Sequence, residues 1–376
     1  MLQINHLSYW EKREFFNQID FLIVGAGIVG YSTAINLRKL NPNSKIVLIE
    51  RGYLPTGASS KNAGFTCFGS PSEIMDDLKN CKEDLVWQTV QMRFDGLKEL
   101  FQIVQNHDIG YEKNGSWELI KNNDTQIDNQ FIKYLNDKCE KLFHVKNVYK
   151  EDTTSFRKFG FKNIQTTYFN SEEGQLDTGK LIRALHWEAN LKGIISLFGI
   201  ELLSYEENRQ SVETETSIGL LSCQKLIICT NGFAGQFIGN DVRPARAQVL
   251  VTKPIENLNF KGTFHIDKGY YYFRNVDDRI LLGGGRNLDF EGETTTEIEV
   301  TQKIQDSLIE LLKNTIIPNS PFEIEHQWAG IMGVGENKFP IIRKHTERVG
   351  FGVRMGGMGV AIGSLVGKQL SKLMSD

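Results

Sequence analysis

Three glycines, Gly25, Gly27 and Gly30, form the pattern G-x-G-x-x-G in the segment IVGAGIVG. This spacing suits a dinucleotide, because the first glycine permits a tight turn, the second lets backbone approach a pyrophosphate, and the third lets a helix pack on the preceding strand. The helix would begin at Ile28 and Val29, whose N–H groups carry a partial positive charge toward the phosphates. The pattern predicts a nucleotide cradle, although glycine-rich turns also occur for steric reasons alone.

A glutamate after the next apolar run supports this prediction. Glu50 lies 20 residues after Gly30, in the segment LIER, and Arg51 follows it. A carboxylate here accepts hydrogen bonds from an adenosine ribose and repels the 2′-phosphate of NADP. NAD and FAD remain as candidates, and the alternative is a surface glutamate at a strand end.

The elements that must position these residues form a βαβ unit. Apolar runs at Asp20–Val24 and Lys45–Ile49 predict two strands, and the spacing of apolar residues in Ile28–Leu40 predicts the helix between them. Such a unit requires a parallel sheet, which predicts the α/β class. A further strand pattern ends at Thr230, and the segments GYYYFRN and RILLGGG are predicted hairpin partners. Other helices are expected over residues 83–106, 125–142, 298–315 and 360–374, and from about residue 178.

The loop GASSKNAGF, which begins at Gly57, directly follows the second strand. Together with IVGAGIVG and LIER it resembles the D-amino-acid oxidase/glycine oxidase superfamily of FAD-dependent oxidoreductases. Five further stretches resemble this family in the same order: EEGQLDTGKLIRAL, LIICTNGFA, RPARAQV, WAGIMGV and GGMGVAIGSLVGKQL. The last has no use in an NAD enzyme, so the resemblance implies FAD. No flavin-attachment signature surrounds Cys67, which implies non-covalent binding.

The resemblance also implies which residues bind FAD. Those expected to contact its phosphates or lie beside the flavin are Ala58, Ser59, Ser60, Lys61 (where arginine is usual), Asn62, Ala63 and Gly64. A second set ends the strand LIICT and consists of Thr230, Asn231 and Gly232. A third set, before the last helix, consists of Gly356, Gly357, Met358, Gly359 and Val360. Backbone N–H groups of this loop would stabilise negative charge on reduced flavin, and ordinary helix capping is the alternative explanation.

The implied architecture has two domains. A Rossmann-type FAD-binding domain with a parallel sheet, discontinuous in sequence, would comprise residues 1–80, 155–240 and 325–376. A β-rich α+β substrate domain would comprise residues 81–154 and 241–324.

The resemblance implies oxidation of the C–N bond of a small-molecule amine or amino acid by hydride transfer to flavin N5, giving an imine that hydrolyses. The form WAGIM is closest to the gamma-glutamylputrescine oxidase-like branch, which acts on amines. The Gly-x-Arg-Pro arginine of the amino-acid oxidases is absent, since this chain has Gly330-Ile331-Met332-Gly333. Alternatives are oxidation of a hydroxy-acid or glycerol-phosphate C–O bond, or a flavin-binding protein without turnover.

Four residues are the candidate catalytic, substrate-contacting positions. Arg354 precedes the flavin loop and could bind a substrate carboxylate, although a second alignment leaves it outside the pocket. Tyr270, Tyr272 and Arg274 alternate onto one face of a predicted strand, which is otherwise a packing face. Leu281 stands where sarcosine oxidase-like relatives carry a lysine that helps oxygen react, so oxygen or a quinone-type carrier is the expected electron acceptor.

The composition fits a globular protein, with 40% hydrophobic and 24% charged residues among 376. A net charge of −3 predicts no nucleic-acid partner. No secretory signal is recognised, and no apolar stretch approaches the roughly 18–20 residues of a membrane span. Five scattered cysteines without CxxC pairs suit a reducing compartment, so a cytoplasmic location is expected. The spacing of histidines and cysteines predicts no metal site.

Overall fold

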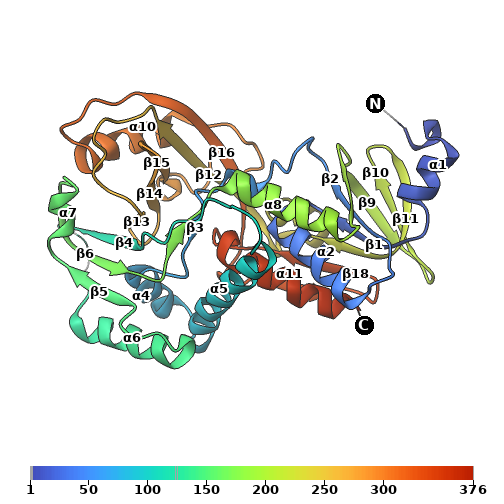
Figure 1. Ribbon diagram of the computed structural model, residues 1–376, viewed down its shortest axis with the longest axis horizontal. Coiled ribbons are helices and arrows are strands. Elements are labelled where there is room, and N and C mark those ends of the chain that lie inside the picture. Colours follow the sequence, from blue (N-terminus) through green and yellow to red (C-terminus); the bar gives the residue numbers. More distant parts are fainter. Residues whose placement is uncertain (1–2, 123, 125, 376) are drawn as a thin grey trace.

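The computed structural model describes residues 3–122, 124 and 126–375, which form two large β-sheets lying side by side (Figure 1). The first sheet is on the right of Figure 1, with α2, α8 and α11 in front of it, and the second is on the left. Thr125, the predicted start of one helix, lies outside the described residues, as do residues 1, 2 and 376 of the predicted domain ranges.

The first sheet has the strand order β17-β18-β11-β1-β2-β8. Its parallel strands are β1 (Ile19–Val24), β2 (Ile46–Glu50), β8 (Ile195–Phe198), β11 (Gly219–Ile228) and β18 (Val349–Val353). Antiparallel strands extend it: β9 (Leu202–Glu207), β10 (Val212–Thr216) and β17 (Ile341–Lys344). The central strands β1 and β2 are mostly apolar and buried, as in parallel sheets covered on both faces. The predicted α/β class is confirmed.

Four helices pack together beside the first sheet: α2 (Ile28–Leu40), α5 (Glu83–Ile103), α8 (Thr178–Leu191) and α11 (Gly359–Ser375). Helix α2 has the predicted bounds. Glycines bring α11 close to its neighbours: a Cβ on Gly367 would lie 2.7 Å from Thr33 N of α2, and a Cβ on Gly96 of α5 would lie 2.1 Å from Ala361 O of α11. The last helix is therefore packed between two helices from the first part of the chain.

The second sheet has the order β16-β12-β15-β14-β13-β4-β6-β5. Its strands are β4 (Ser116–Lys121), β5 (Tyr149–Asp152), β6 (Ile164–Asn170), β12 (Arg243–Thr252), β13 (Thr263–Ile266), β14 (Tyr271–Val276), β15 (Arg279–Gly284) and β16 (Ile324–Val334). Strands β14 and β15 pair antiparallel, which confirms the predicted hairpin. Helix α10 (Gln302–Leu311) packs on β12 and β15. It begins later than the helix predicted over 298–315, and a π-helical turn continues it from Leu312 to Ile316.

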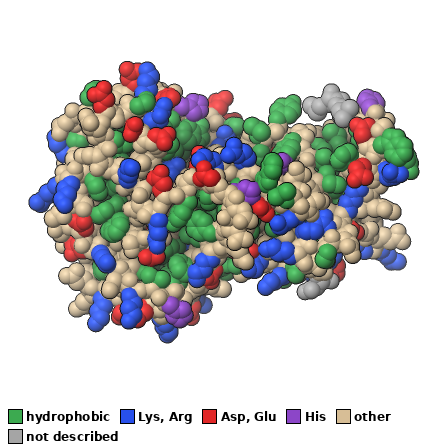
Figure 2. Space-filling view, in the orientation of Figure 1, with side chains coloured by type: hydrophobic (Ala, Val, Ile, Leu, Met, Phe, Trp, Pro, Cys, Tyr) green, Lys and Arg blue, Asp and Glu red, His purple; other side chains and the backbone are tan. Residues whose placement is uncertain are grey.

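The remaining α-helices and strands lie outside the two large sheets and the helices described above. They are α1 (Tyr9–Glu11), α3 (Ala58–Lys61), α4 (Pro71–Asn80), α6 (Asn129–Phe143), α7 (Ser155–Lys158), α9 (Gly235–Ile238), and the paired strands β3 (Phe65–Thr66) and β7 (Gly174–Gln175). None of the helices in the described ranges combines the length and apolar character needed to cross a membrane. Figure 2 shows basic and acidic side chains interspersed over one face of the molecule.

Two strands join the second sheet although they fall in ranges predicted for the FAD-binding domain. Strand β6 lies within 155–240 and β16 lies almost wholly within 325–376, yet β6 pairs with β4 and β16 pairs with β12. A division that follows the sheets would place both strands in the second unit. The domain boundaries stay a prediction.

Buried carboxylates hold the segment 67–73, which runs from the end of β3 into the first turn of α4. Glu173 accepts a hydrogen bond from Phe68 N (2.7 Å), and Glu118 accepts one from Ser72 N (2.9 Å) at the start of α4. Both carboxylates are buried, and burial raises the pKa of each, that of Glu118 to about 7.

Replacing Glu118 by glutamine is expected to remove a pH-dependent loss of stability. Its folded-state pKa of about 7 exceeds the ordinary 4.5, so between these values the folded protein holds a proton that the unfolded chain has released. The stability from this group is therefore complete below about pH 4.5 and declines toward pH 7, by on the order of 2–3 kcal/mol. Urea titrations of the FAD-loaded protein should show Glu118→Gln gaining on the wild type from about pH 5 to about pH 7.

The wild type and Glu118→Gln are compared at each pH because His265, a nearby histidine, changes the stability with pH in the opposite direction. Burial lowers the pKa of His265 to about 4, so its contribution to stability is lost as the pH falls below the ordinary 6.5. This contribution is common to both proteins and cancels in the difference. A stability difference that does not vary with pH would contradict the prediction for Glu118.

Candidate active site

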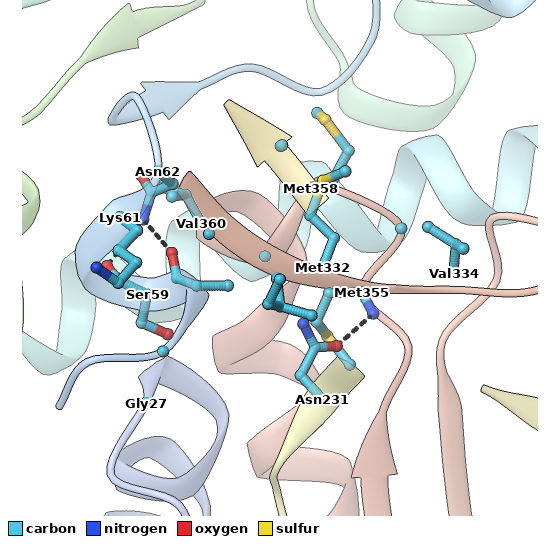
Figure 3. A pocket seen from close by; sticks show the side chains of 18 of the residues that line it. Gly27, Ser59, Lys61, Asn62, Asn231, Met332, Val334, Met355, Met358 and Val360 are labelled. Atoms are coloured by element: carbon cyan, nitrogen blue, oxygen red, sulfur yellow. Dashed lines mark hydrogen bonds between the residues drawn. The ribbon is translucent and has the colours of Figure 1, made fainter. Parts of the chain in front are cut away.

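A cavity of about 610 Å³ is lined by residues of both sheets, beside the carboxyl ends of β1 and β2. Its walls come from the β1–α2 turn, α3, α4, strands β12, β14 and β16, and the loop before α11; Figure 3 shows part of this lining. Open parallel sheets bind ligands at the carboxyl ends of their strands. The volume lies in the roughly 300–1,000 Å³ range of small-molecule and cofactor sites.

The cavity gathers most of the residues predicted to bind the cofactor. Those that line it are Gly25, Gly27, Ile28, Val29, Glu50, Arg51, Ala58, Ser59, Lys61, Asn62, Ala63, Thr230, Asn231, Gly356, Gly357, Met358, Gly359 and Val360. Of the predicted substrate contacts, Tyr270 and Tyr272 line it. The predicted residues outside the lining are Gly30, Ser60, Gly64, Gly232, Arg274 and Arg354.

The β1–α2 turn is built for close backbone approach. Gly25 has φ +105°, a conformation that favours glycine. A Cβ on Gly30 would lie 1.9 Å from Gly25 O, so only glycine lets α2 begin this close to β1. Ser59 Oγ accepts a hydrogen bond from Ile28 N (3.0 Å) and would lie 2.8 Å from a Cβ on Gly27. The start of α2 and the α3 loop therefore form one continuous cradle (Figure 3).

Glu50 and Arg51 lie at the end of β2 on the wall of the cradle. The Glu50 carboxylate accepts hydrogen bonds from Ala26 N (3.0 Å) and Gly52 N (3.1 Å), which fix its orientation. An ionised carboxylate has about four acceptor positions, so it can still receive ribose hydroxyls. The Arg51 guanidinium lies 3.9 Å from the centre of the Phe233 ring, another lining residue.

Two asparagines order the loops farther along the cavity. Asn62 Nδ2 donates to Ser59 O (2.8 Å) and its Oδ1 accepts from Gly64 N (2.8 Å), which closes the α3 turn. Asn231 Oδ1 accepts from Met355 N (3.2 Å), so it joins the end of β11 to the loop before α11 (Figure 3). These contacts preorganise the backbone that faces the cavity.

The predicted glycines and serine outside the lining have packing contacts. A Cβ on Gly64 would lie 2.1 Å from Leu176 O, and one on Gly232 would lie 2.4 Å from Met332 O. Like Gly30, they allow two backbone segments to meet behind the cavity wall. Ser60 Oγ donates to Pro55 O (2.5 Å). Their direct contact with the cofactor stays a prediction.

Arg354 is turned toward backbone oxygens rather than the cavity. It has φ +67°, its Nε donates to Phe339 O (3.0 Å), and its Nη1 donates to Asp241 O (3.2 Å). This arrangement gives the predicted contact with a substrate carboxylate no support. Arg274 is also outside the lining; it is buried beside Gly64, and burial lowers its pKa to about 10.

At the second-sheet end, Tyr272 packs flat over Gly283, where a Cβ would lie 2.6 Å from the ring. Burial raises its pKa to about 12, so the phenol stays neutral and can donate a hydrogen bond. An apolar cluster of Ala63, Val249 and Leu281 packs against its ring. This end of the cavity therefore combines an apolar wall with the phenol of Tyr272.

Sequence reasoning missed Arg286, which lines the cavity directly after β15. Its Nε is buried and has no hydrogen-bond partner among the described residues. Burial lowers the pKa of Arg286, and the nearby Tyr270 and Glu293 only partly offset this effect. The signal was the RILLGGG segment itself: Gly284 (φ +122°) and Gly285 (φ +78°) turn the chain so that Arg286 follows at the cavity.

The residues present fit FAD. The glycine cradle at the start of α2 suits a pyrophosphate, and the oriented Glu50 suits the adenosine ribose. The cavity continues past Lys61 and Met332 to Tyr272, which leaves an apolar region for a flavin.

Comparisons with known proteins agree with this geometry. Residues 20–373 match the family model DAO, FAD dependent oxidoreductase. The chain is 23% identical over 368 residues to the probable oxidoreductase OrdL of Rhizobium meliloti (strain 1021), which covers 94% of this chain and 82% of that protein.

Two solved structures show the same fold. The L-proline dehydrogenase from P. horikoshii has a TM-score of 0.75 at 16% identity and covers 95% of this chain and 93% of its own. The glycine oxidase from Bacillus cereus ATCC 14579 has a TM-score of 0.72 at 16% identity and covers 95% and 97%. Because the family model spans nearly the whole chain and the cradle fits its cofactor, this protein belongs to the DAO family of FAD-dependent oxidoreductases, as its motifs predicted.

Proposed function

We propose that this protein oxidises the C–N bond of a small amine that carries a carboxylate, such as an amino acid, at non-covalently bound FAD in the cytoplasm. The observation that carries the proposal is one cavity that joins a dinucleotide cradle to the half-buried guanidinium of Arg286, whose buried Nε has no hydrogen-bond partner among the described residues. The names of the similar structures, a proline dehydrogenase and a glycine oxidase, support this substrate class.

Bound FAD supplies the acceptor for the hydride that leaves the carbon beside the amine nitrogen, and water hydrolyses the resulting imine. Arg286 would bind the substrate carboxylate through its planar guanidinium, which gives orientation as well as affinity. Tyr272 would donate a hydrogen bond as a neutral phenol. The apolar cluster that contains Val249 and Leu281 would keep water away from this end of the cavity.

Separate observations support non-covalent binding of FAD and a cytoplasmic location. Cys67, the thiol nearest in sequence to the α3 loop, lines the cavity but is 1% exposed, and burial raises its pKa, which makes it a poor nucleophile toward a flavin. All five cysteines are free thiols, as expected in a reducing compartment. The proposed electron acceptor is oxygen or a quinone-type carrier, and the rate of flavin reoxidation in air distinguishes them.

Replacing Arg286 by methionine is expected to raise KM for the carboxylate-bearing substrate about 10- to 100-fold, because a half-buried charge-assisted pair with the carboxylate is lost. The substrate is first found by anaerobic titration of the wild type with a panel of amines and amino acids, followed by flavin bleaching. FAD content should not change.

The matched control is Arg279→Met at the start of β15, the strand that precedes Arg286, because Arg279 pairs with Glu325 (2.6 Å) and does not line the cavity. An unchanged KM in Arg286→Met would remove the carboxylate site from the proposal. Ammonia or a free amine among the products distinguishes C–N oxidation from C–O oxidation, because only hydrolysis of an imine releases nitrogen. If no member of the panel bleaches the flavin, the protein binds flavin without turnover.

A further inference from the structure

Three side chains from distant parts of the sequence meet beside the cavity: Cys67, Glu173 and His265. Their candidate ligand atoms (Sγ, a carboxylate oxygen and a ring nitrogen) lie within 4.8 Å of one another. Cys67 and Glu173 are each 1% exposed, and Cys67 and His265 line the cavity. Cys67 lies in the connection between β3 and α4, Glu173 lies directly before β7, and His265 lies in β13.

We propose that this cluster binds one divalent cation of the zinc class. Thiolate, imidazole and carboxylate are the donors that zinc uses, and three protein ligands with an open fourth position form an accessible site. The fourth position would be completed from the cavity. Ligand atoms around tetrahedral zinc are about 3.3–3.8 Å apart, given zinc–ligand distances near 2.0–2.3 Å, so a small contraction of the cluster suffices.

The state of the imidazole points independently to a missing partner. His265 Nε2 is buried and has no hydrogen-bond partner in the described part of the chain. An unsatisfied buried polar atom costs about 1–3 kcal/mol, and such atoms in a folded protein commonly belong to an ion or ligand site. Burial lowers the pKa of His265 to about 4, so the ring is neutral at pH 7, the form that binds metal.

The carboxylate is held ready by its own partners. One oxygen of Glu173 accepts hydrogen bonds from the backbone N–H groups of Phe68 (2.7 Å) and Gly69 (3.3 Å), and the other accepts from Ser116 Oγ. Outer partners of this kind orient metal ligands. Thr263 Oγ1 lies 3.6 Å from Cys67 Sγ and supplies a polar neighbour for the sulfur.

Charge balance favours a dication over an empty site. A thiolate and a carboxylate together carry two negative charges, which one dication neutralises in a buried position. Binding therefore exchanges the Cys67 thiol proton for a sulfur–metal bond, and affinity should rise with pH.

The test uses the FAD-loaded full chain, stripped with a chelator and titrated with Co²⁺ as the probe. The expected result is about one Co²⁺ per chain, with the red d–d absorption of tetrahedral cobalt, which lies beyond the flavin bands, and a higher midpoint of thermal unfolding. Metal analysis of the protein as purified gives a second count. A Co²⁺ spectrum equal to that of the free ion, without a shift of the unfolding midpoint, would overturn the proposal.

Variants assign the ligands. Cys67→Ser and His265→Gln should weaken Co²⁺ binding by more than the roughly 10- to 100-fold that loss of an outer partner costs. Cys81→Ser is the matched control, because Cys81 also lines the cavity but lies outside the cluster. Flavin content shows whether each variant has folded. Equal Co²⁺ affinity in all of them would refute the site, and these readouts do not depend on turnover, so the proposed function is tested separately.

Discussion

Replacing Gly30 by alanine is expected to give a protein that binds FAD more than 100-fold more weakly and is purified largely without flavin. The new Cβ would lie 1.9 Å from Gly25 O, a backbone atom that cannot rotate away. The start of α2 must then withdraw from β1 by more than about 1 Å, since non-bonded carbon contacts need about 3.5 Å. The pyrophosphate loses the aligned N–H groups of the helix, and a 100-fold loss corresponds to about 2.7 kcal/mol.

Flavin absorbance per chain and the Kd for added FAD measure this effect. The matched control is Gly57→Ala, because Gly57 also lines the cavity, has φ −76°, and would place its Cβ with nothing within 4 Å. Far-ultraviolet circular dichroism checks that both variants fold. If Gly30→Ala retains flavin as well as Gly57→Ala does, the cradle does not hold the pyrophosphate.

Replacing Arg93 by methionine is expected to destabilise the protein by about 3–5 kcal/mol. The Arg93 side chain is 2% exposed and donates to Phe68 O (3.2 Å) and to Glu73 (3.2 Å). Burial alone would raise the pKa of Glu73, but the cations Lys338 and Arg93 hold this pKa well below its usual range. Without Arg93, the buried carbonyl of Phe68 and the partly buried carboxylate of Glu73 each lose a donor, and the segment 67–73 loosens.

The control for Arg93 is Lys338→Met. Lys338 also pairs with Glu73 (2.8 Å), but its side chain is 39% exposed, so the expected loss is nearer to about 1 kcal/mol. Urea unfolding with FAD present measures both variants, and the double variant gives their coupling. Equal losses for the two single variants would show that burial of Arg93 carries no special cost.

The nucleotide-binding unit could be predicted because its determinants are local. Within residues 20–50 the apolar runs, three glycines and one acidic residue follow one another, and the predicted bounds of α2 agree with the structure. Helix α4 was not predicted, because its start is held by Glu118 from β4, far away in sequence. Strands β17 and β18 were also missed; β18 contains Gly350 and Gly352, which pack beneath α11 and weaken the strand pattern.

Part of the candidate site could likewise be predicted from local motifs, and part of it could not. The α3 loop and the loop before α11 could be assigned by their motifs, and most of their residues line the cavity. The role of Arg354 could not be assigned from the sequence, because its hydrogen-bond partners belong to the loop after β16 and to the turn before β12. The cluster of Cys67, Glu173 and His265 could not be predicted either, because these residues are far apart in the sequence and only the fold brings them together.

The packing of α11 between α2 and α5 has a consequence for biosynthesis. The cradle at residues 25–64 emerges from the ribosome early, whereas the loop at 356–360 and strand β18, which pairs with β11, are made near the end of translation. Until then α2 and α5 lack the helix that fills the space between them, and their apolar faces stay open. The flavin can thus be enclosed only after synthesis has passed residue 360, and until then the nascent chain exposes apolar surface of the kind that favours aggregation.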